Sequence, residues 1–310
     1  MSGAATRFSP NGVHVALVAN DRYRPGLQCT RHSMTKACRE PERLVFHEFG
    51  DADMAPFLAR IPLADYNGSK LPYLRLFLPE LLPDCDWVLY SDVDTLWFKD
   101  PCELWDERDE SVSVCWVKDL SSSGMDFRRW TARIGLDVTP SGAYACSGVT
   151  LINLKRWREQ GLTERALDFL RRYGCPPYAD QDVMNVLFAH DAKMLHPDWD
   201  VMIPPYFWRP CVLHVTGMGL RLFGSDHYDG NIAQYVFWFD YYRRHILGLP
   251  RMRRRPALAV RFALSALANL FLGPVLALLD RLPAACPGKF LLMRIRRQLG
   301  YARFGLGIMV

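Results

Sequence analysis

Short apolar runs of strand length alternate with longer stretches of helical spacing along the first 220 residues. Residues 13–19 form an apolar, β-branched run typical of a buried strand, and residues 43–49 alternate apolar with polar side chains. The same patterns predict further strands at 87–90, 111–117, 148–153 and 211–216, and helices at 25–39, 72–82, 163–172 and 180–188. Pro72 fits the first turn of its helix, and Thr163 is the expected N-cap of another. This alternation indicates an α/β fold with a mostly parallel sheet.

The pattern changes after residue 250, where the chain becomes both basic and apolar. Residues 262–279 carry no charge, a length that barely spans a bilayer. Basic residues flank this run on both sides and Gly273–Pro274 interrupts it, whereas a spanning helix carries its Lys and Arg mainly on one side. We therefore expect one globular domain at 1–250 and a basic, helical, membrane-associating extension at 251–310. A spanning helix and an ordinary helix packed on the domain remain as alternatives.

The charges divide along the same boundary. The chain has 38 Lys and Arg against 33 Asp and Glu, a net charge of +5. Residues 251–310 contain eleven of the basic residues and one acid, Asp280, so the remainder, with 27 basic and 32 acidic residues, is mildly acidic. An anionic membrane surface and nucleic acid are two partners for such a segment. We expect no nucleic acid, because the segment lacks interleaved aromatics and any known nucleic-acid-binding module.

Composition excludes several classes of protein. Half of the residues are hydrophobic and 23% are charged, which excludes a mainly disordered chain. The nine cysteines are scattered without a CxxC pair, so a disulfide scaffold or zinc finger is not expected. The first twelve residues lack the apolar segment of a signal peptide. We therefore expect a cytoplasmic protein that is peripheral on the inner face of the cell membrane.

Candidate chemistry begins directly after the strand predicted at 87–90. Asp92 and Asp94 are two residues apart, so in extended chain their carboxylates point the same way. The carboxyl end of a strand in an α/β sheet is where ligands bind. Paired carboxylates of this kind suit Mg²⁺ or Mn²⁺, and such a cation suits a diphosphate. The alternative is a pair of solvated acids in a turn.

Six separated segments extend this motif into a larger pattern. They are LVANDRY at 17–23, YLRL at 73–76, VLYSDVD at 88–94, SGVTLINLKRW at 147–157, DQDVMN at 180–185, and His214 three residues before Gly217. In this order they resemble glycosyltransferase family 8, the retaining enzymes that include bacterial lipopolysaccharide galactosyl- and glucosyltransferases. The resemblance covers about residues 13–220. No single segment is specific, but the set is.

The resemblance implies a fold, an activity and a cofactor. The fold is a single A-type glycosyltransferase domain with a Rossmann-like nucleotide-binding half. The activity is retaining transfer of glucose or galactose from a nucleotide sugar, with UDP favoured, to a glycan or lipid-linked acceptor such as lipopolysaccharide. Asp92, Asp94 and His214 would hold the metal. An imidazole beside two carboxylates favours Mn²⁺, with Mg²⁺ as the alternative.

Further roles follow from the same resemblance. The implied donor-binding residues are Ala19, Asn20, Tyr23, Arg75, Asp92, Val93, Ser147 and Gly217. The implied catalytic residues are Asp119, Asp180 and Gln181. We expect front-face attack, with the leaving phosphate accepting the proton of the acceptor, because Gln181 is a poor nucleophile. Each assignment has a simpler alternative: a turn for Asn20, a surface side chain for Arg75, a core histidine for His214, and a helix start for Asp180.

The sequence also departs from the family pattern and admits other readings. Cys146 occupies a position where the family has Asn or a small polar residue, and Asn20 stands where Asp is frequent. Arg221 is a candidate substitute for the basic residue that follows Gly217 in the family. Residues 92–95 (DVDT) also resemble the DxDxT start of haloacid-dehalogenase phosphatases, with Asp198 and Asp200 as an acidic pair. A non-catalytic membrane-surface binding protein is the remaining alternative.

Overall fold

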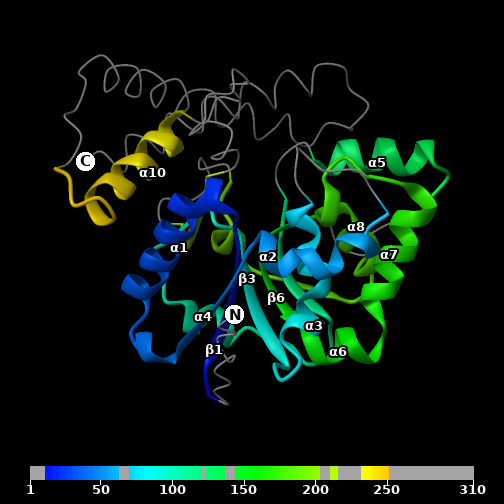
Figure 1. Ribbon diagram of the computed structural model, residues 1–310, viewed down its shortest axis with the longest axis horizontal. Coiled ribbons are helices and arrows are strands. Elements are labelled where there is room, and N and C mark those ends of the chain that lie inside the picture. Colours follow the sequence, from blue (N-terminus) through cyan, green and yellow to red (C-terminus); the bar gives the residue numbers. More distant parts are fainter. Residues whose placement is uncertain are drawn as a thin grey trace.

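A computed structural model describes most of the first 250 residues (Figure 1). The described residues are 11–62, 70–119, 123–136, 138, 144–202, 210–215 and 232–250. The predicted extension at 251–310, together with Gly217 and Arg221, lies outside them. Within the described ranges, no helix is both long and apolar enough to cross a membrane.

The main sheet has six strands in the order β2-β1-β3-β6-β5-β7. β6 runs antiparallel to both of its neighbours, and the other three pairings are parallel. Five strands therefore point one way, which confirms the predicted α/β fold with a mostly parallel sheet. The strands are β1 (Val13–Val18), β2 (Leu44–Phe49), β3 (Trp87–Ser91), β5 (Val114–Lys118), β6 (Ala145–Asn153) and β7 (Ala192–Met194).

A second, two-stranded sheet lies beside the end of β3. β4 (Thr95–Trp97) pairs antiparallel with β8 (Val212–His214), and Thr95 lies opposite His214. The backbone N–H of Val215 donates to the carbonyl of Asp94 at 2.7 Å. The strand predicted at 211–216 is thus present but short, and its partner β4 was not predicted. This pairing brings the two ends of the metal-binding pattern together across 120 residues of sequence.

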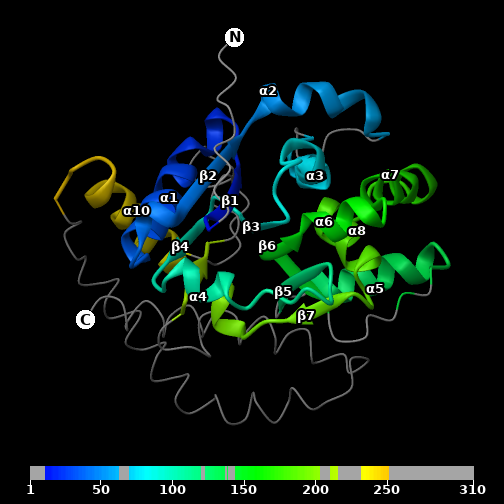
Figure 2. The same cartoon turned by 90° about the horizontal axis from the view of Figure 1, so that it is seen from below.

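Helices cover both faces of the main sheet. Figure 2 shows α3 and α7 on one side, and β4 with α4 on the other. α1 and α10 lie side by side in both views and contact each other (Figures 1 and 2). The helices are α1 (Arg24–Ala37), α2 (Asp51–Met54), α3 (Leu78–Leu81), α4 (Pro101–Trp105), α5 (Ser123–Arg133), α6 (Leu154–Glu159), α7 (Leu162–Tyr173), α8 (Ala179–Leu187) and α10 (Ile232–His245).

The core consists of two main layers separated by the sheet. Alternate residues of β1 serve alternate layers: Val15 and Leu17 pack with α1 and α4, whereas Ala16 packs with α3, α6, α7 and α8. β3 divides in the same way, with Leu89 in the first layer and Tyr90 in the second. Because both faces are covered, these strands read as continuous apolar runs, which made them predictable.

Two helical predictions differ from the structure. Residues 72–82 form a 3₁₀ segment, η4 (Leu71–Phe77), and then the single turn α3. Pro79 lacks the N–H that an uninterrupted α-helix would need, so the helix starts anew around it. Thr163 is not an N-cap, because α7 already begins at Leu162. The N-cap is Gly161, whose φ is +61°. Its hydroxyl instead donates to the carbonyl of Leu76 at 2.8 Å, joining α7 to η4.

Candidate active site

The two aspartates of the metal-binding pattern meet His214 at the carboxyl end of β3. Asp92 and Asp94 lie in the turn between β3 and β4, and His214 is the last residue of β8. His214 Nε2 is 3.1 Å from Asp94 Oδ1 and 3.7 Å from Asp92 Oδ2. One ligand atom from each residue lies within 4.8 Å of the others. The structure therefore brings together three residues that sequence spacing alone could not join.

Gly148 on β6 makes this approach sterically feasible. A Cβ at this position would lie 2.3 Å from His214 Cε1 and 3.0 Å from Asp92 Oδ2. The backbone carbonyl of Gly148 also accepts from the N–H of Asp92 at 2.7 Å. Only a residue without a side chain leaves room for both groups. The sequence pattern contained this glycine, but its steric role became apparent only from the contacts.

Asp200 fixes the orientation of the His214 ring. Asp200 Oδ1 is 2.9 Å from His214 Nδ1, and its side chain is fully buried. When a carboxylate accepts the Nδ1 proton, Nε2 is left facing Asp94 as the ligand atom. Asp200 entered the sequence analysis only as part of a phosphatase alternative. Its proximity to His214, fourteen residues away, is a product of the fold.

The charges of this cluster depend strongly on one another. Burial alone lowers the pKa of His214, but Asp200 and Asp94 outweigh it and leave that pKa well above its usual value. Burial raises the pKa of Asp94, and His214 partly opposes the change. A group of carboxylates gathered around one imidazole favours positive charge at its centre. Two carboxylate oxygens and an imidazole nitrogen are a donor set that fits Mn²⁺.

Arg75 links the acidic cluster to the next group of side chains. It is 4% exposed, which excludes an ordinary surface arginine. Its Nη2 donates to Asp92 Oδ1 at 2.9 Å and to the Tyr90 hydroxyl at 2.8 Å, and its Nη1 donates to the Ser147 carbonyl at 2.7 Å. Its Nε lies 2.6 Å from Asp180 Oδ2. The buried guanidinium of Arg75 therefore balances the charges of Asp92 and Asp180, and these contacts require it to be tightly positioned.

Gln181 lies at the centre of a neighbouring hydrogen-bond network. Its Oε1 accepts from the Ser147 N–H at 3.1 Å. Its Nε2 donates to Asp119 Oδ2 at 3.2 Å and to the Tyr144 hydroxyl at 2.9 Å. The Tyr144 hydroxyl in turn donates to Asp182. The amide group is thus held in one orientation, and Gln181 contacts two other predicted site residues, Ser147 and Asp119.

α8 presents Asp180 and Gln181 through an unusual backbone turn. Ala179 has φ +45°, a left-handed conformation that a residue with a Cβ adopts at a cost of about 1 kcal/mol or more. Asp180 and Asp182 lie in the first turn of the helix, so the helix-start interpretation holds as well. Burial raises the pKa of Asp180 to about 7 although Arg75 opposes the shift. Backbone strain of this kind is frequent where side chains are positioned for function.

The loop after β1 lies close to the acidic pair. Burial, with Asp94 next in importance, raises the pKa of Tyr23, so its ring lies within electrostatic range of the cluster. Asn20 Oδ1 accepts from the Tyr23 N–H at 3.3 Å, which confirms the turn. Ala19 continues the backbone from β1, and Val93 is buried between the two aspartates. Cys146 is also buried, with its Sγ 3.9 Å from His214 Nδ1.

Comparison with known proteins shows the family of the chain. The sequence pattern of glycosyl transferase family 8 matches residues 32–217, more than half of the chain. The chain belongs to glycosyl transferase family 8. This is a family of retaining hexosyltransferases. The match begins within α1, and the loop at 17–23 therefore lies outside it.

Individual relatives match shorter segments. The chain is 29% identical to general stress protein A of Bacillus subtilis over 137 residues, which cover 43% of this chain and 46% of that protein. It is 43% identical to a lipopolysaccharide 1,2-glucosyltransferase of Escherichia coli over 129 residues, 37% of each chain. The matched segments thus span less than half of these relatives.

A solved structure shows the same fold. The galactosyltransferase LgtC, determined with donor and acceptor sugar analogues, superposes with a TM-score of 0.54 at 22% identity. The superposition covers 66% of this chain and 87% of LgtC. At this level of identity the likeness establishes the A-type fold alone, which confirms that part of the fold prediction.

Proposed function

We propose that the chain is a retaining hexosyltransferase that moves glucose or galactose from a nucleotide sugar, with UDP as the favoured nucleotide, to a glycan or lipid-linked acceptor such as lipopolysaccharide. The observation that carries this proposal is the convergence of Asp92, Asp94 and His214 at the carboxyl end of β3. Ligands bind at this edge in α/β folds. Family membership supports the transferase over the phosphatase, whose motif is confined to residues 92–95.

The cofactor that fits these residues is a divalent cation, with Mn²⁺ favoured over Mg²⁺. When bound, it would hold the donor diphosphate and stabilise the negative charge of the departing nucleotide. Asp92, Asp94 and His214 would supply its protein ligands. Asp200 would accept the Nδ1 proton and so keep Nε2 aimed at the metal, as carboxylates behind histidine ligands commonly do.

The remaining site residues would bind and orient the sugar. Tyr23 would stack on the base, with Ala19, Asn20, Val93 and Gly217 as further donor contacts. Arg75 would hold Asp92 and Asp180 in place while it contributes positive charge beside the diphosphate. Asp119 and Gln181, which are hydrogen-bonded to each other, would line the reacting face.

The contacts favour front-face attack over a covalent intermediate. The Asp180 carboxylate is buried against Arg75, so it is not free to act as a nucleophile. The amide of Gln181 is a weak nucleophile, and its Oε1 already accepts a backbone hydrogen bond. The proton of the acceptor hydroxyl would therefore pass to the leaving phosphate on the same face of the sugar.

Donor turnover with purified full chain tests this function. We expect UDP release from UDP-glucose or UDP-galactose in the presence of Mn²⁺, faster with an acceptor than by hydrolysis alone. A chelator should abolish the release. Phosphate release from simple phosphomonoesters with no UDP release would establish the phosphatase instead. Tight donor binding without any turnover would establish the non-catalytic alternative.

We further propose that residues 251–310 hold the domain on the inner face of the cell membrane, close to a lipid-linked acceptor. The support is their charge, with eleven basic residues around the uncharged run 262–279. Each Lys or Arg near an anionic surface contributes about 1 kcal/mol. Replacing the four arginines at 251, 253, 254 and 255 by Gln should weaken co-flotation with anionic vesicles by at least about a hundredfold. Equal flotation of the variant and the native chain would refute the proposal.

A further inference from the structure

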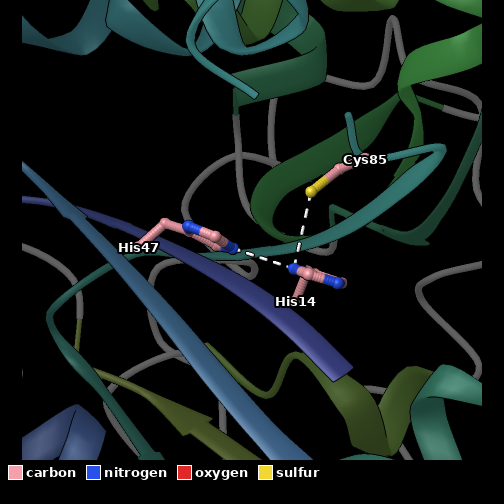
Figure 3. Close-up of side chains that lie close together, drawn as sticks. All are labelled: His14, His47 and Cys85. Carbon is pink, nitrogen blue, oxygen red and sulfur yellow. Dashed lines mark hydrogen bonds between the residues drawn. The ribbon is translucent and has the colours of Figure 1, made fainter. Parts of the chain in front are cut away.

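A second cluster of potential metal ligands lies away from the acidic pair. His14 from β1, His47 from β2 and Cys85, two residues before β3, converge on one point (Figure 3). His14 Nδ1 is 2.9 Å from His47 Nε2 and 3.4 Å from Cys85 Sγ. One ligand atom from each residue lies within 4.8 Å of the others. Two strands and the segment that leads into a third thus bring together side chains of types that commonly bind metals.

The cluster is part of the protein interior. His14, His47 and Cys85 are 4%, 6% and 4% exposed, respectively. Cys85 belongs to the core layer that also contains Ala16 and Val88. Burying two imidazoles inside an apolar layer is costly unless their polar atoms have partners. Here the polar atoms of His14, His47 and Cys85 meet one another.

The protonation states suit metal binding. Burial, followed by the neighbouring His14, lowers the pKa of His47 to about 4, so this imidazole is neutral at physiological pH. The two rings stack with their centroids 5.2 Å apart. Burial raises the pKa of the Cys85 thiol to about 11, so without a cation the sulfur keeps its proton. A cation would displace that single proton to solvent and bind the resulting thiolate.

The position separates this cluster from the transferase site. β1 and β3 are parallel, and Asp92 follows the carboxyl end of β3. His14 and Cys85 lie at the opposite, amino ends of the same two strands. The two clusters thus occupy opposite edges of one sheet.

We propose that His14, His47 and Cys85 form a structural site for a thiophilic transition-metal ion, of the class of Zn²⁺ and Cu⁺. Two imidazoles and one thiolate are a donor set that such ions favour, whereas Mg²⁺ and Mn²⁺ prefer carboxylates. A tetrahedral zinc ion with the usual bond lengths separates two nitrogen ligands by about 3.3 Å and a nitrogen from a sulfur by about 3.6 Å. The distances from His14 Nδ1, 2.9 and 3.4 Å, need to open only slightly.

The consequence of binding would be mechanical. A metal ion at this point ties β2 to the amino ends of β1 and β3, with no part in the transfer reaction. A ligand that binds the folded chain alone raises its melting temperature by mass action. We therefore expect stabilisation by the metal in the absence of any sugar donor.

The opposite preferences of the two sites allow each to be measured alone. Chelator-treated full chain is titrated with Cu⁺ under reducing conditions, because a carboxylate site binds this soft ion poorly, and separately with Zn²⁺, which both sites can bind. We expect one equivalent of Cu⁺, and one Cys85-dependent equivalent of Zn²⁺, to bind tightly and to raise the melting temperature. Co²⁺ serves as a spectroscopic probe, because a Cys ligand adds a thiolate-to-cobalt charge-transfer band.

Matched variants assign the binding to particular residues. Cys85→Ser should remove the charge-transfer band, and Cys85→Ser and His47→Gln should each weaken binding by at least about tenfold. Cys38→Ser is the control, because Cys38 belongs to a different buried cluster with Asp100 and Cys102. It should leave both the band and the affinity unchanged. Loss of tight binding in Cys38→Ser with retention in Cys85→Ser would overturn the assignment.

The native chain alone also decides the question if a variant fails to fold. Absence of tight binding of both Zn²⁺ and Cu⁺, with no thiolate band from Co²⁺, would refute the site. Binding of either ion with Cys85-dependent stabilisation supports it. Because no donor is present and the readouts depend on Cys85, the outcome is independent of transferase activity.

Discussion

The two edges of the central sheet carry clusters that contain the same residue type in opposite electrostatic settings. At the carboxyl edge, His214 faces Asp94 and Asp200, at 3.1 and 2.9 Å. At the amino edge, His47 faces His14, and Cys85 of the apolar core lies close by. The pKa of His214 is raised well above its usual value by its acidic neighbours, which overcome burial, whereas burial lowers that of His47 to about 4.

The difference shows that burial alone does not fix the state of a histidine. Both rings are at least 94% shielded from solvent, yet one favours a positive charge and the other a neutral form. The carboxylates at the first edge favour a cation, and a hard divalent ion would satisfy them. The second edge offers uncharged nitrogen and sulfur atoms instead. The two proposed sites would thus select different metals through their ligands.

The largest test of this contrast removes one carboxylate from the acidic edge. Asp94→Asn keeps the shape of the side chain but removes the charge that would hold the metal. A metal ion supplies several kcal/mol of transition-state stabilisation, so UDP release should fall by about a thousandfold. The measurement is Mn²⁺-dependent turnover of UDP-glucose and UDP-galactose. Asp106→Asn, at an exposed helix end, is the matched control and should retain native turnover. Native turnover in Asp94→Asn would refute the metal assignment.

A smaller effect is expected from crowding the same edge without a change of charge. Gly148→Ala places a methyl group where His214 Cε1 and Asp92 Oδ2 now lie, so one of them must shift. A displacement of about 1 Å in a catalytic group costs on the order of a hundredfold in rate, and overpacking costs about 1–3 kcal/mol in stability. Turnover and thermal unfolding would be measured on the same preparation. A variant that is both stable and fully active would show that the imidazole does not need its present position.

Much of the fold could be predicted from sequence because its central strands are buried on both faces. β1 and β3 appeared as apolar runs bounded by polar residues, and β2, at the edge of the sheet, appeared as an alternating pattern. The positions of all three agree with the structure. β4 has only three residues, too few for any period to emerge, and so was missed. The segment around Pro79 has apolar spacing that suits a 3₁₀ helix and an α-helix alike, so the pattern did not distinguish them.

The candidate site was predictable only where its residues are neighbours in sequence or belong to a recognised motif. Asp92 and Asp94 stand two apart, and their shared direction follows from strand geometry. His214 required the family resemblance. Asp200 and Gly148 act through contacts that the β4–β8 pairing and the β6 backbone create, and no local pattern encodes such contacts. The cluster at the amino edge was missed for the same reason.

A smaller effect is expected from Asp200→Asn, which weakens the acidic setting of His214 without touching the proposed metal ligands. The amide preserves the size of the side chain and can still accept from His214 Nδ1, but it removes the negative charge behind the ring. Changes behind a metal-bound histidine typically cost about 10- to 100-fold in metal affinity. We expect the Mn²⁺ concentration for half-maximal turnover to rise by this factor, with turnover at saturating Mn²⁺ largely restored. A fall in maximal turnover with unchanged Mn²⁺ dependence would argue against a positioning role.

The smallest expected effect concerns Asp182, a further acid at the carboxyl edge of the sheet. Burial raises the pKa of Asp182 to about 6, although hydrogen bonds from Tyr144 and Tyr178 oppose the shift. In the unfolded chain its pKa is about 4, so between these values the folded state binds the proton more tightly. This contribution to the free energy of unfolding is therefore full below about pH 4 and is lost as the pH rises through 6.

Asp182→Asn isolates that contribution, because the amide does not titrate. The difference in free energy of unfolding between the native chain and the variant should shift against the native chain by about 1–3 kcal/mol between pH 4 and pH 7. Denaturant unfolding at a series of pH values gives this difference directly. A pH-independent difference for Asp182→Asn would mean that the hydrogen bonds from Tyr144 and Tyr178 outweigh burial. An acid at this edge would then not need a cation to stay charged.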